Sequence, residues 1–286
     1  MTDHDVVPAS SPGSWSESPP PAADSGRPLS ATRDRLDLDE IHQDSRRQHR
    51  AAAITAGILY ITGTVAGVLS MLVLAPVRDA LDPLASAAGH SGSVVTGALL
   101  ILVMGLSLAF VPIVLFPVLR RVDEVLALGY VIVRGAVETV CYVLLATGVL
   151  LLAPISAAIT AGGDTTSPAG VQVSNLLLHA DATNAVLALV FCLGAAMFYL
   201  LLYRSRIVPP WISIWGLLAI PIYLLADLLS MYGVLGAADT PQVLMFMPLA
   251  LQEMVLAIWM IAHGFRPIHA PHPPLIGDLE GERQQL

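Results

Sequence analysis

A glutamate in the middle of a long apolar segment is the residue of this sequence best placed to do chemistry. Glu253 lies ten residues after Val243 and nine before Ala262, the two ends of its segment. It therefore falls near the middle of a membrane span even if those ends shift by a few residues. An ionisable side chain at that depth costs about 2.5–3.5 kcal/mol on insertion scales and is interpreted first as functional. The adjacent Gln252 adds a second polar group.

Arg134 and Glu138 form a second candidate pair in an earlier apolar segment. Four residues separate them, so a helix presents both on one face. The apolar stretch 125–159 is longer than a membrane requires, about 52 Å as a helix. A span that starts late leaves both side chains at the cytoplasmic headgroups, whereas one that starts early places Arg134 about 13 Å deep, where it can meet Glu253. The sequence is compatible with both positions.

A third candidate, Asp227, lies sixteen residues after Trp211, which opens the next-to-last apolar segment. Tyr223 and Ser230 share its helix face. This position belongs to the outer third of a span, where water reaches a side chain. The position of Asp227 is equally compatible with a residue on a transport path and with a residue at the membrane interface.

These charges suggest two kinds of chemistry. Carboxylates at such positions in pumps and transporters carry protons or ions. Alternatively, nearby glutamates compensate the charge of the arginine in an ion pair. Such a pair would hold the third and sixth membrane segments together. No catalytic residue is predicted, because the sequence contains no GxSxG, HExxH, GxGxxG or P-loop motif. No metal or cofactor is expected, since Cys141 and Cys192 lack the Cys/His spacing of a metal site.

Membrane helices are the elements that must position these residues. Of the 286 residues, 55% are hydrophobic and 13% are charged, about half the usual charged fraction. Charge-free runs such as 51–75 and 91–119 exceed the ~20 residues that cross a bilayer, which excludes a soluble globular protein. The runs predict an all-α bundle of six transmembrane helices near residues 51–74, 94–119, 126–153, 182–203, 211–232 and 243–262.

Arginines distinguish the two sides of this bundle. All 14 basic residues are arginine. On one side of the spans the flanking arginines lie within 46–50, 120–121 and 204–206 and at 266, whereas the opposite loops contain only Arg78. Because arginine accumulates in cytoplasmic loops, both termini are expected in the cytoplasm, with the chain in the inner (plasma) membrane. No basic face for nucleic acid is present.

The two inner loops carry a charged patch made of Arg120, Arg121, Asp123, Glu124, Arg204 and Arg206. The two acids are expected to meet Arg204 and Arg206, which would tie the loops together. The alternative is a binding surface for anionic lipid headgroups or for a protein partner. The oligomeric state is not predicted.

Three regions follow from the composition. Residues 1–45 are rich in Ser, Pro and acids, and their low hydrophobicity predicts a disordered cytoplasmic tail. Residues 46–266 form the six-helix membrane domain. Residues 267–286 are expected to be a short cytoplasmic tail.

Four stretches are similar to a known family: RRQHRAAAITAGILYITGTVAGVLS (46–70), LFPVLRRVDEVLALGY (115–130), LLYRSRIVPPWISIWGLL (201–218) and PLALQEMVLAIWMIAHGF (248–265). Over residues 46–266 the chain resembles the bacterial membrane family catalogued as a domain of unknown function, number forty-three eighty-six. The resemblance implies a six-helix bundle in a bacterial inner membrane and no established activity.

Two functions from different classes remain. The first is a small transporter or permease-like protein, with Glu253, Arg134 and Glu138 at its polar centre and Asp227 on the outer path. The second is a structural or partner-binding membrane component in which the same charges are helix-packing pairs. An enzyme is the third and least supported function.

Overall fold

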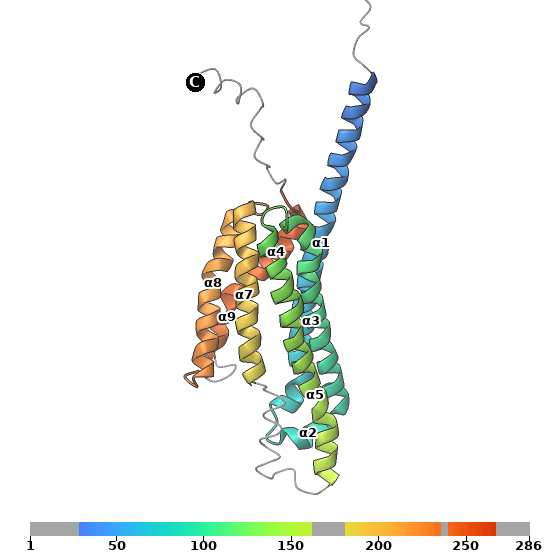
Figure 1. Ribbon diagram of the computed structural model, residues 1–286. Helices are drawn as coiled ribbons and strands as arrows, with labels where there is room; N and C mark the ends of the chain where they lie inside the picture. Colours follow the sequence, from blue (N-terminus) through green and yellow to red (C-terminus); the bar gives the residue numbers. More distant parts are fainter. Residues whose placement is uncertain (1–28, 162–180, 236–239, 267–286) are drawn as a thin grey trace, which may run out of the picture. The chain divides into compact units, whose positions relative to one another are not determined.

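The computed structural model describes residues 29–161, 181–235 and 240–266, and every regular element in those ranges is a helix (Figure 1). The chain divides into two units, Met1–Ser45 and Arg46–Leu286. The second unit contains six helices that are long and apolar enough to cross a membrane. The predicted all-α fold with six spans is therefore confirmed.

Five of the spans belong to single helices, and the third is composite. The single helices are α1 (Leu29–Arg78), α3 (Ser91–Leu119), α7 (Asp181–Ser205), α8 (Pro210–Met231) and α9 (Thr240–His263). The third span joins α4 (Glu124–Tyr130), η1 (Val131–Val137) and α5 (Glu138–Ala161) without a break. A short helix between α1 and α3, α2 (Pro83–Gly89), was not predicted, because seven residues are too few to produce a clear apolar period.

α1 begins at Leu29, inside the stretch 1–45 for which the sequence predicts a disordered tail. From Leu29 to Ser45 the chain contains neither proline nor glycine, the two residues least favourable in a helix interior. Residues 1–28 and 267–286 lie outside the described part of the chain. The tails predicted there stay predictions.

Aspartate side chains start the helices that follow two of the loops. The Asp82 carboxylate accepts a hydrogen bond from the Ala85 N–H at 3.1 Å, at the start of α2. Asp123 accepts one from the Leu126 N–H at 3.0 Å, at the start of α4. Such N-caps satisfy N–H groups that have no acceptor inside the helix. Asp123 thereby fixes where the third span begins.

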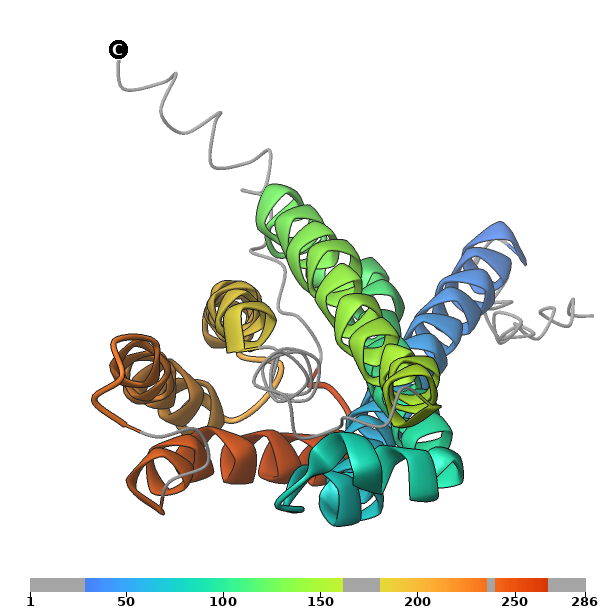
Figure 2. The same cartoon turned by 90° about the horizontal axis from the view of Figure 1, so that it is seen from below.

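The six spans form a closed circuit of neighbours, which Figure 2 shows from below. α3 packs on α5, α5 on α7, α7 on α8, and α8 on α9. α1 completes the circuit, because Gly57 lies against Ala257 of α9 and Gly63 lies against Leu108 of α3. Each span therefore has a side that faces the interior of the bundle.

Glycines permit the close approach of α1 to its two neighbours. A Cβ atom at Gly57 would lie 2.7 Å from the Ala257 carbonyl oxygen, and one at Gly67 would lie 2.6 Å from the Met104 sulfur. Small residues at such spacing let helix backbones come together. The GxxxG pair Gly63 and Gly67 thus serves packing inside one chain.

Candidate functional site

The third span changes its helical type where its charged residues lie. Residues Val131–Val137 form η1, a π-helical segment between α4 and α5. π-Helical turns are rare and occur frequently at functional sites. Arg134 lies within η1, and Glu138 is the first residue of α5. The irregular backbone therefore contains Arg134 and ends next to Glu138.

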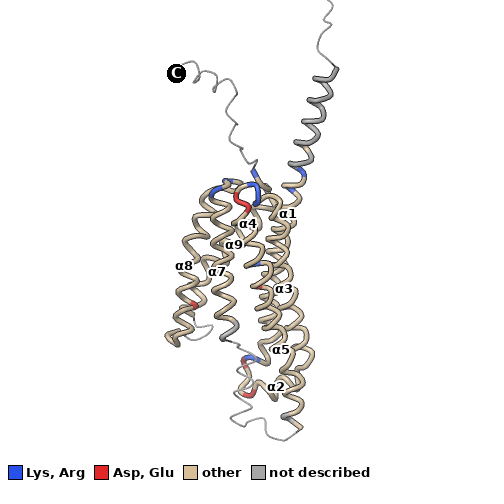
Figure 3. Tube along the Cα trace, viewed as in Figure 1, with Lys and Arg blue, Asp and Glu red and all other residues tan. Residues whose placement is uncertain are grey.

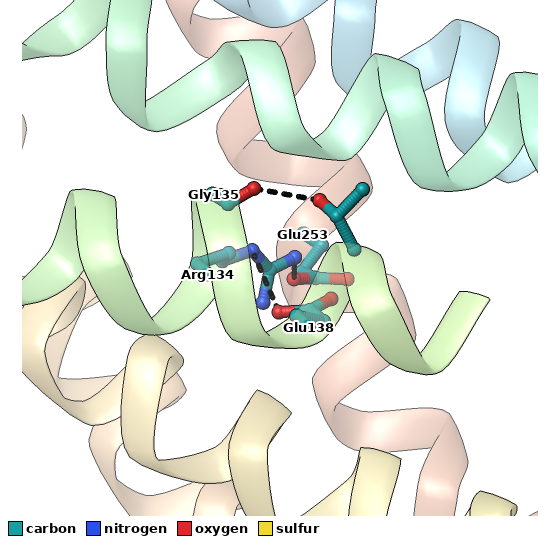
Figure 4. Close-up of polar contacts among 5 residues, drawn as sticks. Arg134, Gly135, Glu138 and Glu253 are labelled. Atoms are coloured by element: carbon teal, nitrogen blue, oxygen red, sulfur yellow. Dashed lines mark hydrogen bonds and ion pairs between the residues drawn. The ribbon is translucent and has the colours of Figure 1, made fainter. Parts of the chain in front are cut away.

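Arg134, Glu138 and Glu253, which we call the central cluster, point toward one another (Figure 4). The Arg134 Nη2 donates a hydrogen bond to Glu253 Oε1 at 3.2 Å, and the Arg134 Nε lies 3.8 Å from Glu138 Oε2. The side chains of Arg134 and Glu138 are each 1% exposed, and that of Glu253 is 15% exposed. The structure brings Arg134 to Glu253, the contact that the sequence analysis expected for a third span that starts early.

Aromatic rings enclose the guanidinium group of Arg134. Its central carbon lies 4.6 Å from the ring centre of Phe191 in α7 and 5.7 Å from that of Tyr60 in α1. A cation over an aromatic face gains about 2 kcal/mol when the pair is desolvated. Tyr60 in turn stacks with Phe198 of α7, with ring centres 6.4 Å apart. Residues of α1, α7 and α9 therefore hold the arginine in addition to its own span.

Several polar atoms in this interior have no hydrogen-bonding partner among the described residues. They include the Nε and Nη1 of Arg134 and the hydroxyl of Tyr199. Buried polar groups are normally hydrogen-bonded, so each exception requires an explanation. The central cluster also has two carboxylates for one guanidinium, which leaves an excess negative charge when all three groups are ionised.

The ligands that the central cluster offers are a guanidinium group, two carboxylates and nearby hydroxyls. Within the described ranges, no three His, Cys, Asp or Glu side chains gather as a metal site. The carboxylates can bind and release a proton, and together with the guanidinium they can hold a small polar solute by charge-assisted hydrogen bonds. The chemistry that this arrangement supports is therefore binding and proton exchange.

Gln252 belongs to a helix contact and not to the central cluster. Its Nε2 donates a hydrogen bond to the Ile212 carbonyl oxygen at 3.0 Å, and the side chain is fully buried. This bond joins α9 to the first turn of α8.

Asp227 lies apart from the central cluster, near the end of α8 that is farther from the α7–α8 loop. It is 7% exposed. Cys192 of α7 interacts electrostatically with both Asp227 and Arg134, and Tyr223 of α8 does so with both Asp227 and Glu253. These two side chains are therefore within electrostatic range of both acidic positions.

The predicted loop patch lies at one end of the bundle, where arginines gather (Figure 3). Arg204 Nη1 and Asp123 Oδ2 form an ion pair at 3.2 Å, which ties the α3–α4 loop to the end of α7. Of the ion pairs between described residues, none joins Glu124 to Arg206. Among the described residues, the expected meeting of the two loops therefore rests on Asp123 and Arg204.

The aromatic residues around the central cluster were missed in the sequence. Tyr60, Phe191 and Tyr199 lie in apolar runs, where their spacing does not distinguish them from ordinary core residues. The usable signal was a tyrosine in the middle of a span, because a buried hydroxyl group needs a polar partner.

Comparison with known proteins gives one match. A family model described as "Domain of unknown function (DUF4386)" matches residues 55–264, a range that includes the whole central cluster. No curated protein and no solved structure matches the chain.

Proposed function

This chain belongs to the DUF4386 family of domains of unknown function, and we propose that it is a small membrane transporter whose binding site is the central cluster. Its six apolar helices make it a multi-pass membrane protein. We place it in a bacterial inner membrane with both termini in the cytoplasm, because the arginines gather at one end of the bundle.

The charge imbalance of the central cluster carries this proposal. One guanidinium faces two carboxylates, and no other described cation forms an ion pair with either of them. A helix-packing pair needs one carboxylate for each arginine, and a second buried carboxylate adds only desolvation cost. Acids beyond structural need, facing the interior of a membrane bundle, are typical of ion and substrate pathways.

Asp227 supports a path that leads away from the arginine-rich end. α8 starts just after the α7–α8 loop at that end, and Asp227 lies four residues before the opposite end of the helix, at Met231. Cys192 and Tyr223 interact electrostatically with Asp227 and with members of the central cluster. A polar route from the central cluster toward the outer face would pass these side chains.

A second candidate function, a structural membrane component, is favoured by two contacts. The Arg134–Glu253 bond joins η1 to α9, and the Gln252 bond joins α9 to α8. Both contacts fasten the last helix to the rest of the bundle. In this alternative the central cluster stays shut off from water.

Anionic lipid headgroups are the partner that we propose for the arginine-rich end in either case. Arg47, Arg120 and Arg121 are exposed there. Basic side chains close to an anionic membrane surface contribute about 1 kcal/mol each to its binding.

Access of water to Cys192 tests the transporter proposal. The experiment treats membrane vesicles that contain Cys141→Ser protein with a positively charged, membrane-impermeant methanethiosulfonate. Cys192 is buried and lies within electrostatic range of Arg134 and Asp227. A transporter must open this region to water during its cycle, so we expect Cys192 to be labelled slowly in the folded protein.

Two variants calibrate the labelling. Cys141→Ser/Cys192→Ser measures background, and the same variant with Glu124→Cys gives the rate at an exposed loop. Complete reaction in sodium dodecyl sulfate shows that Cys192 itself is reactive. Labelling only after denaturation would reject the transporter and favour the structural component.

A further inference from the structure

We infer that the central cluster binds one exchangeable proton and that Glu138 holds it, so that a proton is the ion this site takes. The assignment of that proton to transport rests on the proposed function. The presence of the proton on Glu138 does not, because it follows from the charges and contacts of the folded protein.

The first step is the charge of the central cluster. Arg134 is positive at any physiological pH, because a guanidinium group is not deprotonated in proteins. With Glu138 and Glu253 both ionised, the three side chains would carry a net negative charge in an interior where a lone charge is strongly disfavoured. One bound proton makes the cluster neutral. Two carboxylates that share one site commonly share one proton.

The second step is the choice between the two glutamates. Glu253 Oε1 accepts a hydrogen bond from Arg134 at 3.2 Å, and a charge-assisted bond of this kind stabilises the ionised carboxylate. Glu138 Oε2 lies 3.8 Å from the Arg134 Nε, beyond hydrogen-bond distance, and the other side chain that pairs with Glu138 is the uncharged hydroxyl of Tyr142. Glu138 is also the more buried of the two, at 1% against 15% exposed. The proton therefore belongs on Glu138.

Among the described residues, no further charged group near Glu138 changes this result. The charged groups that face it are Arg134 and Glu253. The remaining titratable groups near it are uncharged at neutral pH, namely Tyr60, Tyr130, Cys141, Tyr142, Cys192 and Tyr223. α3 packs on both η1 and α5, and its sequence Ser91–Leu119 contains no titratable residue.

The geometry allows the proton to change places without a change in net charge. Arg134 lies between the two carboxylates, with Nη2 toward Glu253 and Nε toward Glu138. If the Glu138 O–H bond breaks and a proton binds a Glu253 oxygen, Glu138 keeps the electron pair and becomes the carboxylate. The guanidinium then pairs with Glu138. Each of the two states contains one proton, one carboxylate and one guanidinium.

Infrared spectroscopy of the full chain in lipid tests the inference. A protonated carboxylic acid has a carbonyl stretching band that a carboxylate lacks, and this band shifts in D2O. Glutamate labelled with 13C at the side-chain carboxyl separates the glutamate bands from that of the buried Asp227. We expect one glutamate carboxylic-acid band at neutral pH, and we expect it to disappear at alkaline pH.

Two conservative variants assign the band. Glu138→Gln removes the protonated group, and Glu253→Gln leaves Arg134 with Glu138 as its only counter-ion, so we expect the band to be lost in both. Glu124→Gln at the exposed start of α4 is the matched control and keeps the band. Absence of the glutamate carboxylic-acid band from the wild-type protein, or survival of the band in Glu138→Gln, would overturn the inference.

The infrared experiment and the labelling experiment test the two proposals independently. A glutamate band together with an unreactive Cys192 would keep the proton on Glu138 and reject transport. A reactive Cys192 without the band would keep the transporter and reject the proton.

Discussion

Arg134 lies between two carboxylates but donates a hydrogen bond to only one of them. The two glutamates are therefore unequal in energetic terms, although both face the same guanidinium group. Glu253 compensates the charge of the arginine directly, whereas Glu138, neutral with its proton bound, accepts no hydrogen bond from the arginine. Stability measurements on single variants can separate these roles.

We predict that Arg134→Ala destabilises the protein most, Glu253→Gln less, and Glu138→Gln least. Removing the arginine leaves two buried acids without a cation and also removes its packing on Phe191 and Tyr60. Loss of one partner of a buried ion pair costs about 3–5 kcal/mol. In Glu253→Gln the remaining glutamate takes over as counter-ion, so the loss is smaller. Thermal unfolding of the purified protein in detergent measures the order.

The double variant Arg134→Ala/Glu253→Gln provides the check. If the two residues interact in the folded protein, its loss is smaller than the sum of the single losses, with a coupling of about 0.5–3 kcal/mol. Single variants as stable as the wild-type protein, with additive effects, would contradict a buried pair at this position.

At the scale of elements, the closed circuit of six spans depends on how closely α1 approaches its neighbours α3 and α9. Gly57 leaves no room for a methyl group, because an added Cβ would lie 2.7 Å from both the Ala257 carbonyl oxygen and a side-chain carbon of Ile261. A backbone oxygen cannot rotate away as a side chain can. α1 and α9 would have to separate, and α9 carries Glu253.

We predict that Gly57→Ala destabilises the protein by about 1–3 kcal/mol, the usual effect of overpacking. Gly92→Ala is the matched control, since Gly92 is also helical and an added Cβ there would meet nothing within 4 Å. Alanine is the better helix former by about 1 kcal/mol, so the control is expected to be neutral or stabilising. Equal melting temperatures for the two variants would contradict the close contact of α1 with α9.

Element boundaries were predictable where an apolar run alone determines them. The spans at 94–119 and 211–232 agree with α3 and α8 within three residues at each end. η1 was not predictable, because a π-helical segment depends on how neighbouring helices pack and its sequence VIVRGAV has no distinguishing signal. The depth of Arg134 was left open for a related reason, since the stretch 125–159 is longer than one span and the contact with α9 decides the register.

At the scale of the whole molecule, the site was only partly predictable. Glu253 was found by its depth, which the length of its segment determines. Its partner was one of two alternatives, and the aromatic residues around the guanidinium were missed because hydrophobicity does not distinguish Tyr60 or Phe191 from packing residues. Asp227 was found as a polar exception, but its burial in the structure follows from the contacts of α8 with α7 and α9.

Orientation in the membrane is the last property of the whole molecule that can be tested directly. Asp79 and Glu124 are exposed acidic residues that follow α1 and open α4, and these two positions lie at opposite ends of the bundle. The arginines gather at the end that carries Glu124. Because positive loops stay in the cytoplasm, Asp79 is expected outside and Glu124 inside.

We therefore predict opposite labelling of two single-cysteine proteins that lack Cys141 and Cys192. In intact cells, an impermeant thiol reagent labels the Asp79→Cys protein and leaves the Glu124→Cys protein unlabelled until the cells are lysed. The two positions control for each other, because each variant replaces an exposed acid at an end of the bundle. Labelling of Glu124→Cys in intact cells would invert the orientation, and the polar route past Asp227 would then lead toward the cytoplasm instead of the outer face.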